Sequence, residues 1–151
     1  MRLTERTLGA GVLSDEAAAR AVELIDGELD RAFEQVPEFE SLVGAVRIVG
    51  LAGTVSTLAQ LDVGLAKYDR DAVHHRRLTD RDVHRWRTLL GGEPPEQRLR
   101  RPGMEAGRED VIVGGLIVLE EVLARFRASE LIASESDILD GIVATMLMDG
   151  L

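Results

Sequence analysis

The sequence predicts an α/β domain in which helices cover a largely parallel sheet. Short β-branched apolar segments alternate along the chain with longer segments whose apolar residues recur at helical spacing. The chain has 151 residues, 45% of them hydrophobic, which is enough for one domain with a buried core. Because such alternation is typical of βα units, residues 1–151 are expected to form a single α/β domain.

The first part of the chain is expected to contain a strand, a helix and a second strand. Residues 3–8 predict a short strand, and glycines at positions 9 and 11 predict a turn. Ser14, followed by two acidic residues, suits the N-cap of a helix. Pro37 ends that helix, and residues 43–51 predict a buried strand. The helix carries one apolar stripe, formed by Ala18, Ala21, Val22, Ile25, Leu29, Ala32 and Phe33.

The middle of the chain predicts two helices separated by a polar connection. The first helix covers residues 55–63 and ends near Gly64, and residues 68–78 form the connection. Thr79 and Asp82 resemble a capping box that starts the second helix. Its inward residues are Val83, Trp86 and Leu90, and it stops at the glycines and prolines of positions 91–95.

The last part predicts a short helix, a long helix, a strand and a final helix. The short helix covers residues 96–101, the long helix residues 109–128 and the strand residues 130–134. The final helix runs from Asp137 to the C-terminus. The long helix is apolar all round in its first half, so it should be covered on nearly every side. The final helix should bury a stripe formed by Ile138, Leu139, Ile142, Val143, Met146 and Leu147. With three strands predicted, the sheet is small and incomplete for so many helices.

Composition excludes several classes of function. The sequence has no cysteine, so disulfides, thiolate metal sites and thiol redox chemistry are excluded. The longest apolar run, residues 111–119, is much shorter than the roughly 20 residues that span a bilayer. The N-terminal residues lack the apolar segment of a secretion signal. We therefore expect a cytoplasmic protein that does not bind a membrane.

The charge is unevenly distributed along the chain. The formal net charge of −9 argues against general affinity for nucleic acid. Nine of the 18 basic residues nevertheless lie in one segment, as Arg76, Arg77, Arg81, Arg85, Arg87, Arg98, Arg100, Arg101 and Arg108. Local ion pairs on solvated helix faces are the favoured interpretation. The alternative is a surface for a polyanion, for which Arg76, Arg77 and Arg81 are the candidates.

The turn between residues 51 and 55 could hold an anion. Gly50 and Gly53 would let the backbone approach a ligand closely, and a helix N-terminus follows with free N–H groups. Hydroxyl donors are available from Thr54, Ser56 and Thr57. The segment is neither a Walker A motif nor a full GxGxxG motif, because Ala52 takes the place of the middle glycine. From spacing alone, a simple strand-to-helix corner is the favoured interpretation, and an anion-binding loop is the alternative.

The histidines give a weaker signal. His74 and His75 are adjacent and should point in different directions, and His84 has no partner at i+4. We expect no metal site in this chain and no catalytic triad. Trp86 and Met104 are expected to serve packing alone.

Several segments, in this order, resemble the C-terminal half of the Ppx/GppA family of exopolyphosphatases and guanosine pentaphosphate phosphohydrolases. The matching segments are RLTER at 2–6, GLAGTVSTLA at 50–59, LDVGL with YD at 61–69, VHHRRLT at 73–79, RPGMEAGREDVIVGGLIVLEEVL at 101–123 and ELIASESDILDGI at 130–142. Each is modest alone, but together they cover nearly the whole chain.

The resemblance implies an actin-like, ribonuclease H-like fold of two lobes, of which this chain resembles the second. It also implies Mg²⁺-assisted attack of water on a terminal phosphoanhydride of polyphosphate or of guanosine pentaphosphate (pppGpp). In the family, two phosphate loops and a glutamate base precede the RLTER motif. The Mg²⁺ ligands and the catalytic base are therefore expected outside these 151 residues, with no catalytic residue inside them, and a homodimer is a further family expectation.

Some residue roles follow from the matched motifs. The family's GxGGT-type loop falls on Gly50, Ala52, Gly53 and Thr54, which with Thr57 are the predicted phosphate-binding residues. A second signature falls on Ser134, Glu135 and Gly141. We interpret this signature as structural, with the serine in a turn and the glycine in close packing.

Met1 stands where the family usually has valine, and a GUG valine codon can serve as a start. The hypothesis is that the start is internal and that the first lobe lies upstream. The chain alone is then expected to be inactive. The rival hypothesis is a non-catalytic phosphate- or nucleotide-binding module, or a degenerate truncated paralogue.

Overall fold

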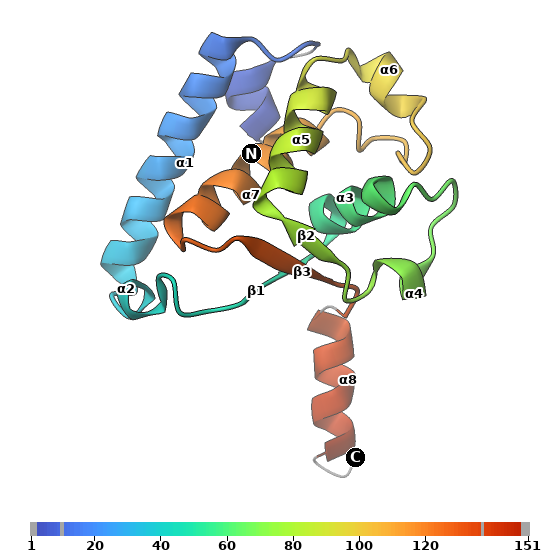
Figure 1. Ribbon diagram of the computed structural model, residues 1–151. Coiled ribbons are helices and arrows are strands. Elements are labelled where there is room, and N and C mark those ends of the chain that lie inside the picture. The colour runs from blue at the N-terminus through green and yellow to red at the C-terminus, as the bar shows by residue number, and fades with distance from the viewer. Residues whose placement is uncertain (1–2, 10, 137, 149–151) are drawn as a thin grey trace.

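The longer helices of the body lie on one side of a small sheet, and the C-terminal helix projects away on the other side (Figure 1). The computed structural model describes residues 3–9, 11–136 and 138–148. The strands are β1 (Ile48–Leu51), β2 (Arg77–Thr79) and β3 (Glu130–Ser134), in the order β1-β3-β2. β3 pairs parallel with β1 and antiparallel with β2. The prediction of a largely parallel sheet is therefore wrong, because the sheet is mixed. The sequence did not reveal this, since β2 has only three residues and carries no pattern that indicates its direction.

The helices follow the predicted order closely. They are α1 (Asp15–Gln35), α2 (Phe39–Leu42), α3 (Gly53–Val63), α4 (Arg70–Val73), α5 (Asp80–Gly91), α6 (Pro95–Leu99), α7 (Ile112–Arg125) and α8 (Ile138–Met148). Ser14 caps α1 by accepting a hydrogen bond from the Ala17 N–H. The capping box of Thr79 and Asp82 is confirmed at the start of α5. Gly64 ends α3 at φ 79°, a conformation that glycine adopts without strain.

Residues 3–8 do not form the expected strand. They form a π-helix, η1 (Thr4–Leu8), whose Leu3 and Leu8 side chains pack against the core beside α7. A Cβ at Gly114 of α7 would lie 3.1 Å from Thr4 Oγ1, so the glycine allows this close approach. Packing of these two partly buried leucines against the core stabilises the helical segment.

Two other segments also differ from expectation. The strand predicted for residues 43–51 begins only at Ile48, because Gly44 turns the chain at φ 73° and donates its N–H to the Phe126 carbonyl at 2.8 Å. The polar connection at residues 68–78 contains α4 and the beginning of β2. Tertiary contacts, which local sequence does not encode, set both boundaries.

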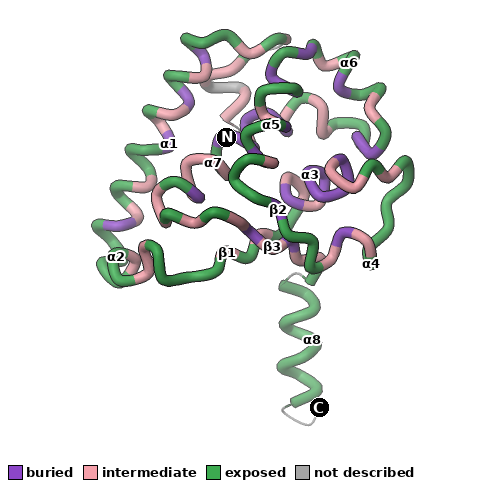
Figure 2. The backbone as a smooth tube through the Cα atoms, in the orientation of Figure 1, coloured by how far each residue is buried: buried purple, intermediate pink, exposed green. Residues whose placement is uncertain are grey.

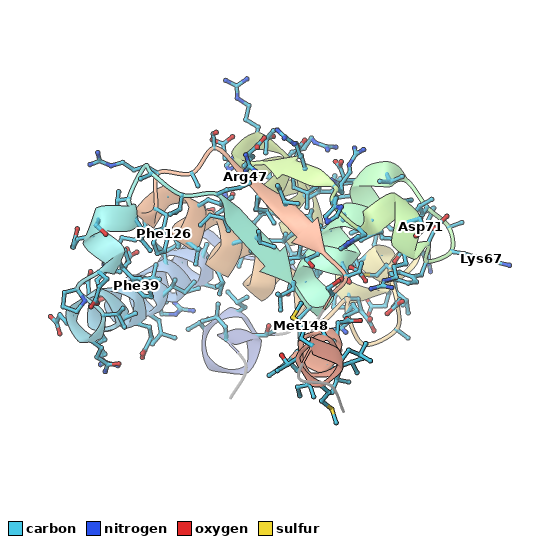
Figure 3. All side chains as sticks on the ribbon, turned by 90° about the horizontal axis from the view of Figure 1, so that it is seen from below. Phe39, Arg47, Lys67, Asp71, Phe126 and Met148 are labelled. Carbon is cyan, nitrogen blue, oxygen red and sulfur yellow. The ribbon has the colours of Figure 1, made fainter. Side chains whose placement is uncertain are left out.

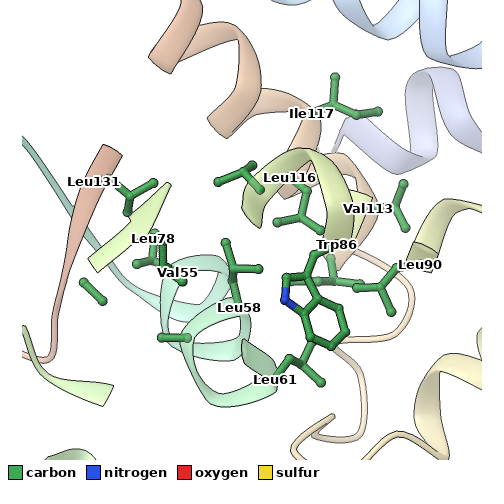
Figure 4. Packing of buried hydrophobic residues seen from close by; sticks show 14 of the residues in the cluster. Val55, Leu58, Leu61, Leu78, Trp86, Leu90, Val113, Leu116, Ile117 and Leu131 are labelled. Carbon is green, nitrogen blue, oxygen red and sulfur yellow. The ribbon is translucent and has the colours of Figure 1, made fainter. Parts of the chain in front are cut away.

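The core lies between α3, α5, α7 and the sheet (Figure 4). Its largest fully enclosed side chains are Leu58, Leu78, Leu90, Ile112, Leu116, Ile117, Leu131, Val73 and Val83. Each such side chain contributes about 2 kcal/mol by leaving water. Trp86 and Met104 are buried as expected. α7 is covered along most of its first half, although Val118 is 38% exposed.

Three phenylalanines hold the far end of α1 against α2 and α7. The ring centroids of Phe33, Phe39 and Phe126 lie 5.3 to 5.8 Å apart in tilted or edge-to-face geometry, and Figure 3 labels the last two. This is the separation that aromatic pairs favour. The cluster explains how the four-residue α2 is held in place.

The predicted burial of α8 is wrong. Figure 1 and Figure 2 show this helix projecting from the body, and all of its described residues are exposed. Nothing lies within 4 Å of a Cβ built at Gly141, so the close packing expected there is also wrong. The expected start at Asp137 and any extension past Met148 lie outside the described residues. Within the described chain, no helix has the length and apolar character needed to cross a bilayer.

Candidate functional site

The corner between β1 and α3 places a helix N-terminus at the end of a parallel strand. β1 ends at Leu51, and α3 begins at Gly53. Between them, Ala52 has φ 68° and ψ −178°, a region that only glycine enters readily. Such a conformation costs on the order of 1–3 kcal/mol, and strained residues of this kind cluster at ligand-binding positions. The corner thus combines free helix N–H groups with a strained backbone.

The two glycines of the corner serve different neighbours. A Cβ at Gly50 would lie 2.8 Å from Val55 Cγ2 and 2.9 Å from Leu131 Cδ1, so Gly50 is required by core packing. A Cβ at Gly53 would lie 2.3 to 2.5 Å from the guanidinium atoms of Arg108. A side chain at position 53 would therefore displace the Arg108 guanidinium, which rests on Gly53.

Arg108 brings a positive charge to the first residue of α3. It lies in the turns before α7, where its carbonyl accepts the N–H groups of Val111 and Ile112. Its side chain is half-buried, and within the described part of the chain no hydrogen bond or ion pair holds its guanidinium. A guanidinium beside helix N–H groups matches the geometry and charge of a phosphate.

The hydroxyl residues predicted for the site point in three directions. Thr54 faces α7, where a Cβ at Gly115 would lie 2.4 Å from its Oγ1. Thr57 is only 4% exposed. Ser56 donates a hydrogen bond from Oγ to Glu135 Oε1 at 2.5 Å. Of the three, Ser56 is the hydroxyl that the structure connects to another polar group at this edge.

Glu135 follows β3 and lies at the same edge of the sheet as the corner, because β1 and β3 are parallel and Leu51 pairs with Ser134. Its Oε2 accepts a hydrogen bond from the Tyr68 hydroxyl, and its backbone N–H donates to His74 Nδ1 at 3.0 Å. The hydrogen bond to Glu135 raises the pKa of Tyr68 to about 12, with burial and the negative charge of Glu135 adding to it. Both carboxylate oxygens are thus engaged.

The two adjacent histidines do not diverge as expected. Their rings stack with centroids 3.8 Å apart, because the chain turns at His75, where φ is 64°. His84 contacts Glu120, with 2.9 Å between its Nδ1 and Glu120 Oε1. Within the described residues, no group of three or more acidic or histidine side chains could hold a metal ion.

The three arginines considered for a polyanion surface, Arg76, Arg77 and Arg81, do not share one environment, because two of them form ion pairs. Arg76 and Arg85 both contact the Asp62 carboxylate, at 2.8 and 2.7 Å. Arg77 contacts Glu130 at 3.1 Å. Arg81 instead lines a surface pocket of about 700 Å³ between α5 and the end of α7. Local ion pairs therefore account for Arg76 and Arg77.

Arg98 is the buried member of the arginine-rich segment. Its guanidinium donates to three backbone carbonyls: Leu90 at 2.7 Å, Glu109 at 3.0 Å and Gly11 at 2.7 Å. Burial lowers its pKa. These bonds join the end of α5, the turn before α7 and the N-terminal turn, so Arg98 is a structural residue.

Sequence reasoning identified the corner but missed the contact between Arg108 and Gly53. The two residues are far apart along the chain and no spacing rule connects them. The signal available was that both belong to the motif segments 50–59 and 101–123. The hydrogen bonds of Glu135 to Ser56 and Tyr68 were missed for the same reason.

Nearly the whole chain matches known proteins. The model of the Ppx/GppA phosphatase family matches residues 1–149. Exopolyphosphatase 2 of Mycobacterium tuberculosis is 37% identical over 150 residues, which are 97% of this chain and 46% of that protein. A Ppx/GppA structure from Aquifex aeolicus superposes with a TM-score of 0.85 and 27% identity, over 97% of this chain and 45% of that one. The solved structure of an exopolyphosphatase-like protein superposes with a TM-score of 0.86 and 31% identity. The match covers 99% of this chain and 48% of that one.

These relatives confirm the expected actin-like α/β fold, here helix-rich with a small three-stranded mixed sheet. The chain spans about half the length of the relatives it matches.

Proposed function

Because this chain belongs to the Ppx/GppA phosphatase family, we propose that it supplies the phosphate-holding corner of an exopolyphosphatase-type hydrolase. The substrate is a chain of phosphoanhydrides, either polyphosphate or guanosine pentaphosphate. The observation that carries the proposal is the Arg108 guanidinium, which rests on Gly53 at the N-terminus of α3 without an acidic partner among the described residues.

The physical chemistry of the corner suits a terminal phosphate. The first turn of α3 offers backbone N–H groups and the positive end of the helix dipole. Arg108 adds a guanidinium that can hydrogen-bond two phosphate oxygens at once. Donors fixed before the substrate arrives can position the phosphate and offset its charge during hydrolysis.

Attack on the phosphate also needs a water molecule and a base that takes its proton. This corner offers no carboxylate that is free to act as that base among the described residues. Glu135 is the carboxylate that contacts the corner through Ser56, and hydrogen bonds occupy both of its oxygens. We propose that Glu135 positions Ser56 and Tyr68 and that it takes no proton from water. This favours, as a second candidate for the chain alone, a phosphate-binding module that does not hydrolyse its ligand.

Mg²⁺ is the cofactor that the family resemblance implies. The described residues do not fit it by themselves, because they form no cluster of three acidic or histidine ligands and Glu135 is already hydrogen-bonded. No step proposed for this chain passes through a metal ion that it holds. The contribution of the corner is binding and orientation of phosphate.

The test joins the chain to the part of exopolyphosphatase 2 that it does not match. Release of phosphate from polyphosphate and from guanosine pentaphosphate is measured with Mg²⁺ for the chain alone and for the fusion. We expect release by the fusion only, with at least tenfold loss of kcat/KM in Arg108→Ala and little change in Arg100→Ala. Release by the chain alone would contradict the assigned binding role, and an active fusion insensitive to Arg108→Ala would remove the corner from the proposal.

A further inference from the structure

A histidine holds the backbone of Glu135, the residue whose carboxylate contacts the α3 corner. The Glu135 N–H donates a hydrogen bond to Nδ1 of His74 at 3.0 Å. His74 follows α4, and its own N–H donates to the Arg70 carbonyl at 2.8 Å. An imidazole nitrogen accepts a hydrogen bond only when it carries no proton. The bond to Glu135 therefore exists only while Nδ1 of His74 is unprotonated.

The segment around His74 is attached to β3, which places the imidazole at the end of this strand. The next residue, His75, has φ 64° and donates its N–H to the Ala133 carbonyl at 2.8 Å. The Ala133 N–H in turn donates to the Arg76 carbonyl at 2.8 Å. Figure 1 shows this segment, between α4 and β2, passing the end of β3. With its ring stacked on His75, His74 is in place before any ligand binds.

Groups of both charges surround this hydrogen bond. Besides His75, they are Arg70 of α4, whose guanidinium donates to the Glu135 carbonyl at 3.4 Å, and Asp140 of α8, 3.9 Å from Arg70. The side chain of Glu135 adds a second negative charge. These opposite charges offset one another, whereas a proton on Nδ1 of His74 would face the Glu135 N–H directly. Loss of the hydrogen bond is therefore the main effect of protonation here.

The backbone of Glu135 determines where its carboxylate lies. Oε1 accepts a hydrogen bond from Ser56, in the first turn of α3, and Oε2 accepts one from the Tyr68 hydroxyl. With both oxygens engaged, the carboxylate does not occupy the free N–H groups at the start of α3. A carboxylate released from these bonds could accept from the same N–H groups, and its charge would repel a phosphate.

We propose that His74 is a positioning residue of the α3 corner, whose unprotonated Nδ1 holds Glu135 where its carboxylate leaves the anion site free. Protonation of His74 releases Glu135, and phosphate binding weakens. The corner is thus regulated by pH through a side chain that does not touch the ligand. This inference rests on the proposed phosphate-binding role, but the hydrogen bond itself can be measured without a ligand.

The first experiment follows the hydrogen bond by NMR of the ¹⁵N-labelled chain between about pH 8 and about pH 5, the range in which histidines commonly titrate. The imidazole nitrogens report protonation of His74, and hydrogen exchange reports release of the Glu135 amide. We expect the protection factor of this amide to fall at least tenfold as His74 gains its proton. His74→Asn, whose Oδ1 can accept the same bond at every pH, should keep the amide protected. Protection unchanged through the His74 titration would overturn the proposal.

The second experiment measures tripolyphosphate affinity over the same pH range, with Trp86 fluorescence confirming that each protein stays folded. Because protonation of the ligand is common to all variants, the comparison with His74→Asn isolates the histidine. We expect the wild type to weaken at least threefold more than His74→Asn, with the midpoint at which His74 protonates. His74→Phe should bind weakly throughout. His84→Asn, which replaces an exposed histidine beside Glu120, should behave as the wild type.

The outcomes separate this inference from the proposed function. Wild type and His74→Asn weakening in parallel would overturn the inference alone, because phosphate would still bind. A wild type that binds no tripolyphosphate at any pH would contradict the proposed function, and the regulatory role with it.

Discussion

Arg98 and Arg108 belong to the same arginine-rich segment and occupy opposite kinds of environment. Arg98 is 4% exposed, and each of its guanidinium nitrogens donates to a backbone carbonyl. Arg108 is half-buried on the glycine that starts α3, and the described residues give it neither a carbonyl nor a carboxylate. The Arg98 side chain therefore joins three segments of the fold, whereas the N–H donors of Arg108 are available to bind a ligand.

The difference shows that charge density alone does not identify a binding site. Local ion pairs were the favoured interpretation of the arginine-rich segment, with a polyanion surface as the alternative, and Arg76, Arg77, Arg87 and Arg101 are all engaged by acidic side chains. What separates Arg108 is its position at a helix N-terminus beside a strained residue. The following predictions test this separation from the largest expected effect to the smallest.

Replacing Arg98 should have the largest effect on stability. Arg98→Met removes three hydrogen bonds to backbone carbonyls, at about 1 kcal/mol each, so we expect a loss of about 3 kcal/mol in the free energy of unfolding. Urea unfolding followed through the single tryptophan, Trp86, measures it. Arg100→Met, at an exposed position, is the control. Equal stability of the two variants would contradict the structural role of Arg98.

The two glycines of the corner should separate stability from binding. Gly50→Ala forces Val55 and Leu131 apart, so we expect a loss of about 1–3 kcal/mol in stability. Gly53→Ala meets the end of a flexible arginine, which can move, so stability should change little while tripolyphosphate affinity falls. Urea unfolding and calorimetric titration measure the two effects. If Gly53→Ala kept full affinity, the contact with Arg108 would have no part in binding.

Ala52 offers a smaller test of strain at the same corner. Ala52→Gly removes a Cβ at φ 68°, and we expect the protein to gain about 1 kcal/mol in stability. The greater freedom of glycine in the unfolded chain offsets part of the gain. Thermal and urea unfolding measure it. A loss of stability would show that Ala52 is not strained.

The titration of Tyr68 should give the smallest effect. It is the single tyrosine, so the near-ultraviolet absorbance of the phenolate reports its pKa directly. We expect about 12, falling toward 10.0 in Glu135→Ala. Because the folded state keeps the proton that the unfolded state releases, this contribution to stability is complete below pH 10 and is lost as the pH rises through about 12. An unchanged pKa in Glu135→Ala would exclude their hydrogen bond as its cause.

Local patterns predicted the parts of the fold that local chemistry determines. The strand Glu130–Ser134, the N-cap Ser14 and the capping box of Thr79 and Asp82 all occur where their residues place them. The loop at residues 50–54 was recognised from its glycines and the helix after it. Short-range hydrogen bonding and periodicity are sufficient for such features.

The remaining features depend on contacts between distant segments. Leu3 and Leu8 pack on α7 as part of a helix, although their spacing suited a strand. α8 has the composition of a buried helix, but burial requires a surface to cover it and composition does not supply one. The contact of Arg108 with Gly53 likewise arises only after folding.

The central claim is that the α3 corner binds phosphate through Arg108, and calorimetric titration with inorganic tripolyphosphate tests it most directly. The wild-type chain, Arg108→Ala and the exposed-arginine control Arg100→Ala are compared at one salt concentration. We predict binding by the wild type and the control, with Arg108→Ala weaker by at least tenfold, about 1.4 kcal/mol. Equal affinity of Arg108→Ala and the wild type would contradict the claim.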